Sequence, residues 1–194
     1  MVVSTSPLVQ FQTMTRGLAL DGALASLKLD YQGVICGVFL LEQALSSYYW
    51  MPLVDSGVTA QGVVEMSNLV PLERSDGRYV TYLLNYTHRS GALFQKTDAE
   101  MLALYRRDLQ ELFPGAEQHI IDQFVFRAPF VEPIWTVGYR KHLPPTSVIP
   151  GRLYLACTAQ VYPRVNSWNS CCAVVESMIP GLEREAARVL ERSA

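Results

Sequence analysis

Strand-like and helix-like segments follow one another without regular alternation in this chain of 194 residues. Runs rich in Val, Ile, Phe and Tyr, bounded by turn residues, predict strands. They cover residues 2–5, 31–41, 47–51, 62–66, 79–86, 120–126 and 153–156. A βαβ protein would place one helix after each strand, and this chain does not. The order predicts an α+β fold with a mixed, mostly antiparallel sheet, or part of a larger α/β protein.

The clearest helix signal covers residues 98–113. Thr97 and Glu100 have the spacing of a capping box, which satisfies backbone donors at a helix start. One apolar stripe follows, formed by Met101, Tyr105, Leu109 and Leu112. This segment is therefore predicted to be an amphipathic helix that covers a sheet.

Weaker helix signals occur elsewhere. A short helix is expected over 18–27, and helical spacing also covers 169–179 and 182–190. Pro180 and Gly181 are expected to interrupt the last run, with Pro180 as the first residue of a new helix. The proline-bearing stretch 128–150 is expected to be a loop with short extended pieces.

Charge and hydropathy exclude several classes of protein. The net charge is −2 and no run is rich in Lys or Arg, so a nucleic-acid binder is not expected. The longest apolar stretch, around residues 34–41, is too short to cross a bilayer. The first residues lack the basic region and apolar core of a signal peptide. We therefore expect a cytoplasmic protein without a transmembrane segment.

Metal and nucleophile motifs are missing from the sequence. The four cysteines, at positions 36, 157, 171 and 172, show no CxxC spacing with histidines and are expected to be free, buried thiols. The three histidines, at positions 88, 119 and 142, have no carboxylate or serine at motif spacing. We predict no metal site and identify no catalytic residue.

The C-terminal part carries the most informative segment. Residues 151–163 read GRLYLACTAQVYP, and NSWNS at 166–170 leads into a helix. A strand that ends beside a helix start brings unpaired N–H groups and a partial positive charge to one place. Such a site stabilises negative charge on a neighbouring group.

This strand–loop–helix resembles the last such unit of the flavin-containing amine oxidoreductases, the superfamily of monoamine oxidase, protoporphyrinogen oxidase and phytoene desaturase. Residues 2–7, VVSTSP, resemble the strand by which that family's chain enters its substrate domain. The resemblance covers nearly the whole chain in order. It implies a substrate-binding-like domain over 1–150 and, over 151–194, a strand–helix segment that would complete an FAD-binding domain.

The resemblance also implies binding residues. The cofactor-binding residues would be Ala156, Cys157 and Thr158 near the ribityl–phosphate part and Trp168, Asn169, Ser170 and Cys171 near the flavin ring. For Asn169 and Ser170, ordinary helix capping is the alternative. The residues that would line a pocket for a small apolar or aromatic substrate are Tyr48, Tyr49, Trp50 and Tyr139. Aromatic packing on a half-buried sheet is the alternative for these.

Two departures from the family pattern limit what the chain is expected to do alone. Cys157 replaces a glycine that lets the backbone approach the cofactor. No GxGxxG motif, which holds the pyrophosphate of FAD, occurs in the sequence. We expect a partial FAD-dependent amine-oxidase-type oxidoreductase that is inactive as this chain alone, either a fragment or dependent on a partner chain.

Two further expectations follow from the missing motif. The alternative function is a non-catalytic binding or interaction domain that has lost the FAD-binding half. In either case strands 2–5 and 153–156 are expected to be exposed sheet edges, which favour self-association or a partner chain.

Overall fold

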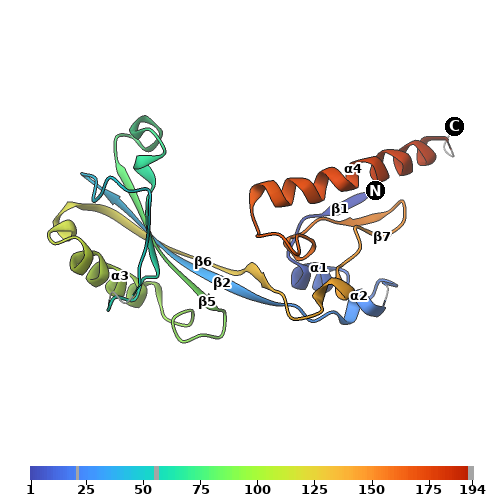
Figure 1. The fold of residues 1–194 in the computed structure, drawn as a ribbon, viewed down its shortest axis with the longest axis horizontal. Coiled ribbons are helices and arrows are strands. Elements are labelled where there is room, and N and C mark those ends of the chain that lie inside the picture. Colours follow the sequence, from blue (N-terminus) through green and yellow to red (C-terminus); the bar gives the residue numbers. More distant parts are fainter. Residues whose placement is uncertain (21, 55–56, 192–194) are drawn as a thin grey trace. The chain divides into compact units, whose positions relative to one another are not determined.

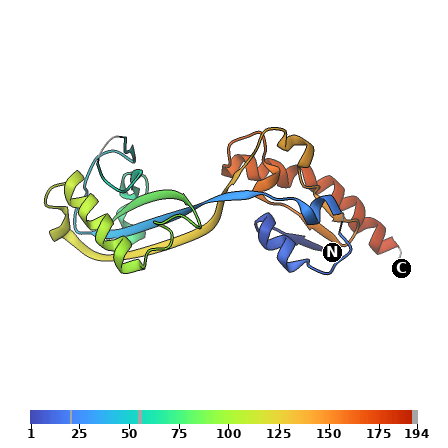
Figure 2. The ribbon, with the colours of Figure 1, turned by 90° about the horizontal axis from the view of Figure 1, so that it is seen from below.

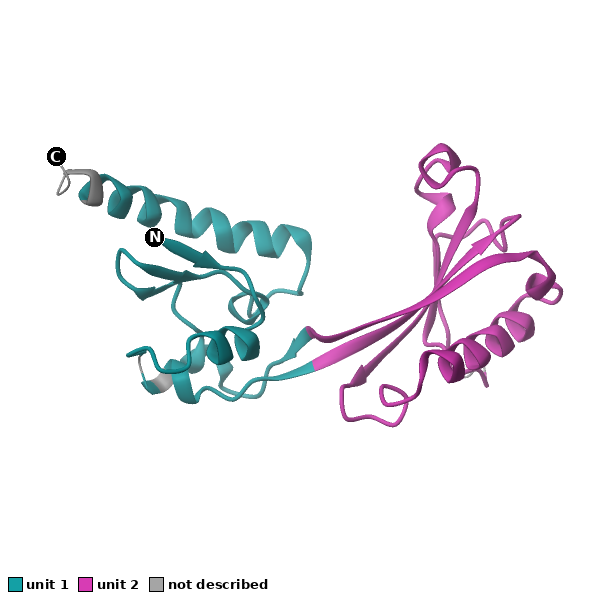
Figure 3. Cartoon of the chain, turned by 180° about the vertical axis from the view of Figure 1, so that it is seen from behind, with its two compact units in different colours: residues 1–31, 132–194 teal, residues 32–131 magenta. Residues whose placement is uncertain are grey.

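The computed structural model describes residues 1–194 except 21, 55–56 and 192–194. The chain forms two compact units (Figure 3). Unit 1 contains residues 1–31 and 132–194, and unit 2 contains residues 32–131. The functional division at residue 150 stays a prediction, and the compact units divide the chain differently.

Unit 1 joins the two ends of the chain through a small sheet. Its strands lie in the order β1 (Val2–Ser4), β8 (Leu153–Leu155), β7 (Ser147–Ile149). β1 runs parallel to β8 with Val3 opposite Tyr154, and β7 runs antiparallel to β8 (Figure 1). Because β8 has partners on both sides, the expectation that residues 153–156 form an exposed edge is wrong. The edge on that side is β1.

The helices of unit 1 differ from the expected ones. α1 (Leu8–Met14), which buries Leu8 and Phe11, had no clear signal in the sequence. α2 (Gly22–Ser26) is shorter than the predicted helix over 18–27, and residue 21 lies outside the described residues. The short 3-10 helices are η4 (Tyr139–His142) and η5 (Thr158–Gln160).

The longest helix, α4 (Trp168–Glu191), continues through Pro180. The expected interruption at Pro180 and Gly181 is therefore wrong. An interior proline removes one backbone hydrogen bond and strains the preceding turn. Packing outweighs this cost, because Ser170 and Met178 on the inner face of α4 are buried.

Unit 2 is built on a five-stranded sheet with the order β3-β4-β5-β2-β6. Its strands are β2 (Asp30–Leu41), β3 (Trp50–Pro52), β4 (Gly62–Glu65), β5 (Tyr79–His88) and β6 (Ile120–Ile134). The pairs β3/β4, β4/β5 and β5/β2 are antiparallel. With the mixed sheet of unit 1, this confirms the predicted α+β class.

Two strands of unit 2 differ from their expected extents. Only the end of the predicted strand 47–51 is a strand, within β3. β6 continues to Ile134 through part of the expected loop 128–150. Its Pro129 and Pro133 are tolerated because β6 is an edge strand, where a proline need not break a ladder between strands.

α3 (Asp98–Leu112) covers one face of this sheet (Figure 2). Along β2 every second residue is buried, including Ile35, Phe39 and Leu41, and the residues between them are half-buried. Gly37 lies under Tyr105 of α3, where an added Cβ would stand 2.5 Å from the ring. The sheet therefore has a closed face against α3 and an open face. The remaining 3-10 helices are η1 (Met66–Asn68), η2 (Leu72–Ser75) and η3 (Ala116–His119).

Candidate functional site

In unit 1 the end of β8 and the first turns of α4 enclose a pocket of about 230 Å³. Its lining residues are Thr5, Ala156, Cys157, Thr158, Cys171, Val174 and Val175. The Ala156 N–H donates to the Ser4 carbonyl at 2.9 Å, which continues the β1–β8 pairing to the pocket. The structure thus brings four of the predicted cofactor residues, Ala156, Cys157, Thr158 and Cys171, around one hollow.

A second hollow of about 620 Å³ adjoins it along α4. It is lined by Asn166, Ser167, Trp168, Cys171, Cys172, Val175 and Glu176. Cys171 and Val175 line both hollows, so the two form one continuous surface. Trp168, which lines the second hollow, is 91% exposed.

The start of α4 is capped by Ser167, which the sequence analysis did not single out. Its Oγ accepts the Ser170 N–H at 3.3 Å, and its carbonyl accepts the Cys171 N–H at 2.9 Å. Ser170 is buried, with its hydroxyl accepting from Ser167 Oγ at 3.0 Å. Asn169 is exposed and lines neither hollow. Of these predicted residues, Ser170 faces the interior and Asn169 faces solvent.

Asn166 holds Cys171 in place, another contact that the sequence analysis missed. The Cys171 thiol donates to Asn166 Oδ1 at 3.6 Å, and Asn166 Nδ2 donates to Glu132 Oε2 at 3.1 Å. Asn166 opens the NSWNS segment, so its position was the available signal. Glu132 lies 34 residues before Asn166, and nothing in the sequence indicated this contact.

The four cysteines are free, as expected. Only Cys157 is buried, so the expectation that all four are buried is wrong for the other three: Cys36 and Cys171 are half-buried, and Cys172 is exposed. Burial raises the pKa of the Cys157 thiol to about 11. Cys157 is therefore a neutral thiol at physiological pH and brings no charge to the pocket.

Tyr139 lies inside unit 1. It is 3% exposed, and its hydroxyl donates to the Ala159 carbonyl at 2.8 Å. Its ring centroid lies 5.5 Å from that of Tyr162 and 6.3 Å from that of Trp135. Burial raises its pKa. Tyr139 thus braces the loop after β8, whereas the other three predicted substrate residues belong to unit 2.

The open face of the unit 2 sheet carries rows of apolar side chains. Trp50, Val64, Tyr82 and Val38 stand opposite one another in register across β3, β4, β5 and β2. Tyr86 pairs with Val34 in a further row. On β6, Val125 packs against the core, so Phe124 and Phe126 point to the open face, with ring centroids 6.4 Å apart.

The six-membered ring of Trp50 lies against Gly62, which has no side chain to displace it. A Cβ at Gly62 would stand 2.2 Å from Trp50 Cη2. Tyr49 is close enough to raise the pKa of Tyr82, after the larger effects of burial and Cys36. Tyr48, Tyr49 and Trp50 are 69%, 44% and 47% exposed. Trp50 therefore lies on the open face with Tyr49 near Tyr82, whereas Tyr48 is the most exposed of the three.

Two features are missing from the described part of the chain. No group of three or more His, Cys, Asp or Glu side chains there is arranged to hold a metal ion. No helix there combines the length and the apolar character needed to cross a membrane.

Comparison by sequence found no matching family model and no matching curated protein. Comparison by structure found related folds. A protein from Exiguobacterium sp. 255-15 assigned as a protoporphyrinogen oxidase has a TM-score of 0.70 and 16% identity, over 95% of this chain and 41% of its own. An oxidoreductase from Methanosarcina mazei has a TM-score of 0.64 and 12% identity, over 92% and 42%.

Putrescine oxidase has the same fold over 97% of this chain and 42% of its own, with a TM-score of 0.59 and 13% identity. These proteins fall in the flavin amine oxidase superfamily. The fold expected from the C-terminal motif is thereby confirmed. This chain spans about two fifths of the length of the proteins it matches.

Proposed function

We propose that this chain, which has the fold of one part of the flavin amine oxidoreductases, supplies two components of an FAD-dependent amine-oxidase-type enzyme. The first is the surface against the flavin ring, and the second is an aromatic wall for the substrate. The observation that carries the proposal is the pocket in which the end of β8 meets the first turns of α4. Catalysis requires a further nucleotide-binding part.

The residues present fit the ring and ribityl parts of a flavin, and the sequence contains no motif for its pyrophosphate. Ala156, Cys157 and Thr158 form one wall and Cys171 the other, and Trp168 stands exposed at the rim. Cys157 has extended backbone angles, φ −141° and ψ 167°, which a residue with a side chain adopts without strain. The helix start places partial positive charge beside the ring, although Ser167 occupies part of it.

The proposed substrate surface is apolar and aromatic. Trp50, Tyr82 and Tyr86 offer ring faces and edges on which a flat or apolar molecule can stack. A bound flavin would supply the redox chemistry by accepting a hydride from a C–N or C–C bond. These side chains would orient the substrate and exclude water, and we assign none of them an acid–base role.

The test is a titration of the full chain with riboflavin and with FAD, followed by flavin fluorescence. Because the chain provides ring contacts and no pyrophosphate motif, both should bind with similar, weak affinity. Cys171→Trp should abolish binding by filling both hollows. Ser177→Trp, on an exposed position of the same helix, is the matched control and should have no effect. Binding of neither flavin would contradict the proposal.

A non-catalytic binding domain is the second candidate, favoured by the absence of GxGxxG from the sequence. In that case an apolar fluorescent dye would bind the open face of unit 2, and it would bind the Trp50→Ala variant more weakly. Flavin fluorescence would then show no binding of either flavin. For either function we place the protein in the cytoplasm, supported by its four free cysteines.

A further inference from the structure

β6 ends the sheet of unit 2 and has a long free edge. No other strand in the described part of the chain pairs with its outer side. An edge strand presents unpaired N–H and C=O groups, and proteins usually protect it with Lys, Pro or bulges. Residues 120–128 of β6 contain no Pro and no Lys. Ile121, Phe124 and Phe126 there are 47%, 42% and 60% exposed.

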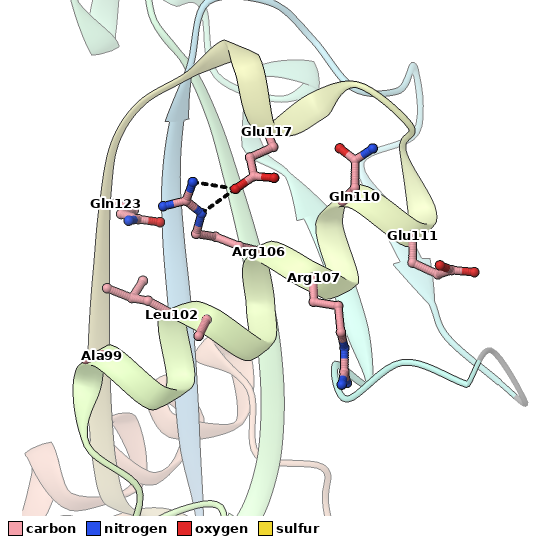
Figure 4. Close-up of a pocket in the computed structure, with 9 residues that line it drawn as sticks. Ala99, Leu102, Arg106, Arg107, Gln110, Glu111, Glu117 and Gln123 are labelled. Atoms are coloured by element: carbon pink, nitrogen blue, oxygen red, sulfur yellow. Dashed lines mark hydrogen bonds and ion pairs between the residues drawn. The ribbon is translucent and has the colours of Figure 1, made fainter.

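A hollow of about 730 Å³ lies beside this edge, between β6 and α3 (Figure 4). Its apolar side is made by Ala99, Leu102 and Ala103. Gln123 Oε1, on β6, is buried and has no hydrogen-bond partner in the part of the chain that the structure describes. An acceptor left without a partner costs on the order of 1–3 kcal/mol, so turning this buried oxygen outward, where a donor at the free edge can reach it, would be favourable.

The charges around the hollow are of both signs. Arg106 is bonded to Glu117, as Figure 4 shows, and Arg107 and Glu111 also line it. A surface that meets its own copy across a two-fold axis must be self-complementary, so each positive group needs a negative one on the same surface. This surface meets that condition, and a strongly basic or acidic partner would not match it.

We propose that β6 pairs antiparallel with β6 of a second copy of this chain, with the two-fold axis at Val125. That register places Phe124 opposite the partner's Phe126 on the open face. On the other face Gln123 stands opposite the partner's Arg127. The sheets of two copies then form one continuous sheet.

The contacts in this register are complementary. Two aromatic cross-strand pairs form, each contributing up to about 1 kcal/mol. Arg127 brings a guanidinium whose buried Nε has no partner among the described residues, while its other nitrogens bind Asp98 and the Lys96 carbonyl. Gln123 can turn its amide oxygen to that guanidinium. The pairing extends the open face without covering it, so this inference does not depend on the proposed function.

The experiment is sedimentation equilibrium of the full chain over a wide concentration range. The unmodified chain should form a reversible dimer. The double variant Phe124→Glu, Phe126→Glu places like charges opposite each other twice and should raise the dissociation constant about tenfold or more. The double variant Phe124→Lys, Phe126→Glu places opposite charges there and should dimerise more tightly than the first. Circular dichroism confirms that both variants are folded.

The control tests the other sheet edge. Val2→Glu with Val3→Glu alters the exposed side of β1 and should leave the dimer intact. Dissociation by this variant would place the contact at β1 and overturn the proposal. A monomer at all concentrations, or equal dissociation of the two Phe124/Phe126 variants, would overturn it as well.

Discussion

At the scale of single residues, Glu65 is the most unusual group in unit 2. It is fully buried, and its Oε2 accepts from the Leu45 N–H at 3.3 Å and from Thr81 Oγ1 at 3.1 Å. Its Oε1 has no hydrogen-bond partner among the residues that the structure describes. Burial raises the pKa of this carboxyl above its ordinary value of 4.5, in spite of the two hydrogen bonds.

The raised pKa of Glu65 fixes the sign of its effect on stability. The stabilisation that protonated Glu65 contributes is complete below pH 4.5, the ordinary pKa of the carboxyl. This stabilisation is lost as the pH rises through the higher pKa of the folded state. Glu65→Gln should remove this loss and raise the free energy of unfolding at neutral pH, because the neutral amide places no charge in the buried site. Urea unfolding at several pH values measures it. Glu111→Gln, at an exposed position, is the control, and an equal gain from both would refute the assignment.

Gly62 and Trp50 form a second residue-level test. The ring of Trp50 occupies the place of a Cβ at position 62, so Gly62→Ala should destabilise the chain by about 1–3 kcal/mol. In the Trp50→Ala background the same substitution should cost much less, because the clash is gone. A double-mutant cycle by urea unfolding gives the coupling energy. Additive effects would show that the ring does not lie on Gly62.

At the scale of elements, the capping box of α3 is present as the sequence predicts. Thr97 Oγ1 accepts the Glu100 N–H at 3.3 Å and donates to Glu100 Oε2 at 2.8 Å, and the Thr97 N–H donates to the same oxygen at 2.8 Å. Hydrogen bonds from Thr97 lower the pKa of the Glu100 carboxyl, and the bond from the Thr97 backbone N–H has a larger effect than the bond from its side chain. The contribution of Glu100 is therefore present above pH 4.5 and is lost as the pH falls through the folded pKa.

Removing the threonine hydroxyl tests this cap. Thr97→Ala should lower the free energy of unfolding by about 1 kcal/mol at neutral pH, and by less in acid, where Glu100 is protonated. Thr97→Ser keeps the hydroxyl and should restore most of the loss. Thermal unfolding followed by circular dichroism at both pH values is the measurement. An equal cost at both pH values would mean that the carboxylate takes no part in the cap.

Pro180 in α4 allows a test in which a substitution should stabilise the chain. Pro180→Ala restores a backbone donor inside the helix and should stabilise the chain by about 2 kcal/mol. This figure allows for the greater freedom that alanine gives the unfolded chain, which offsets part of the gain. Gly181→Ala, at an open position next to it, should stabilise by about 1 kcal/mol. Far-ultraviolet circular dichroism and thermal unfolding follow both. A loss of helicity in the alanine variants would show that Pro180 and Gly181 support this helix.

These elements show which parts of the fold the sequence could predict. α3, β2 and β5 were predictable because caps, alternation and turns act between near neighbours. The continuity of α4 was not, since the packing that overrides Pro180 is tertiary. The same applies to the candidate site. Its strand end and helix start are local signals, whereas the contacts of Glu132, Thr5 and Tyr82 depend on strand register between distant segments.

At the scale of the molecule, the two units have different relations to the sequence. Unit 2 is one continuous segment, and its buried cluster, from Ile35 to Ala116, lies wholly within residues 32–131. Unit 1 is discontinuous, because β1 pairs with β8 at the other end of the chain. Folding of unit 1 must therefore close a long loop, while unit 2 forms from closer contacts.

This difference predicts two separable unfolding transitions in the full chain. Leu155→Ala, at a fully buried position of β8, should lower the stability of unit 1 by about 3 kcal/mol and leave unit 2 unchanged. Leu83→Ala, equally buried on β5, should do the reverse. Of the three tryptophans only Trp50 belongs to unit 2, so Trp135→Phe with Trp168→Phe makes fluorescence report on unit 2 alone. Urea unfolding in that background should shift with Leu83→Ala and not with Leu155→Ala. If both substitutions shift the Trp50 transition equally, the chain folds as one cooperative body, because a loss of packing in one unit is then felt in the other.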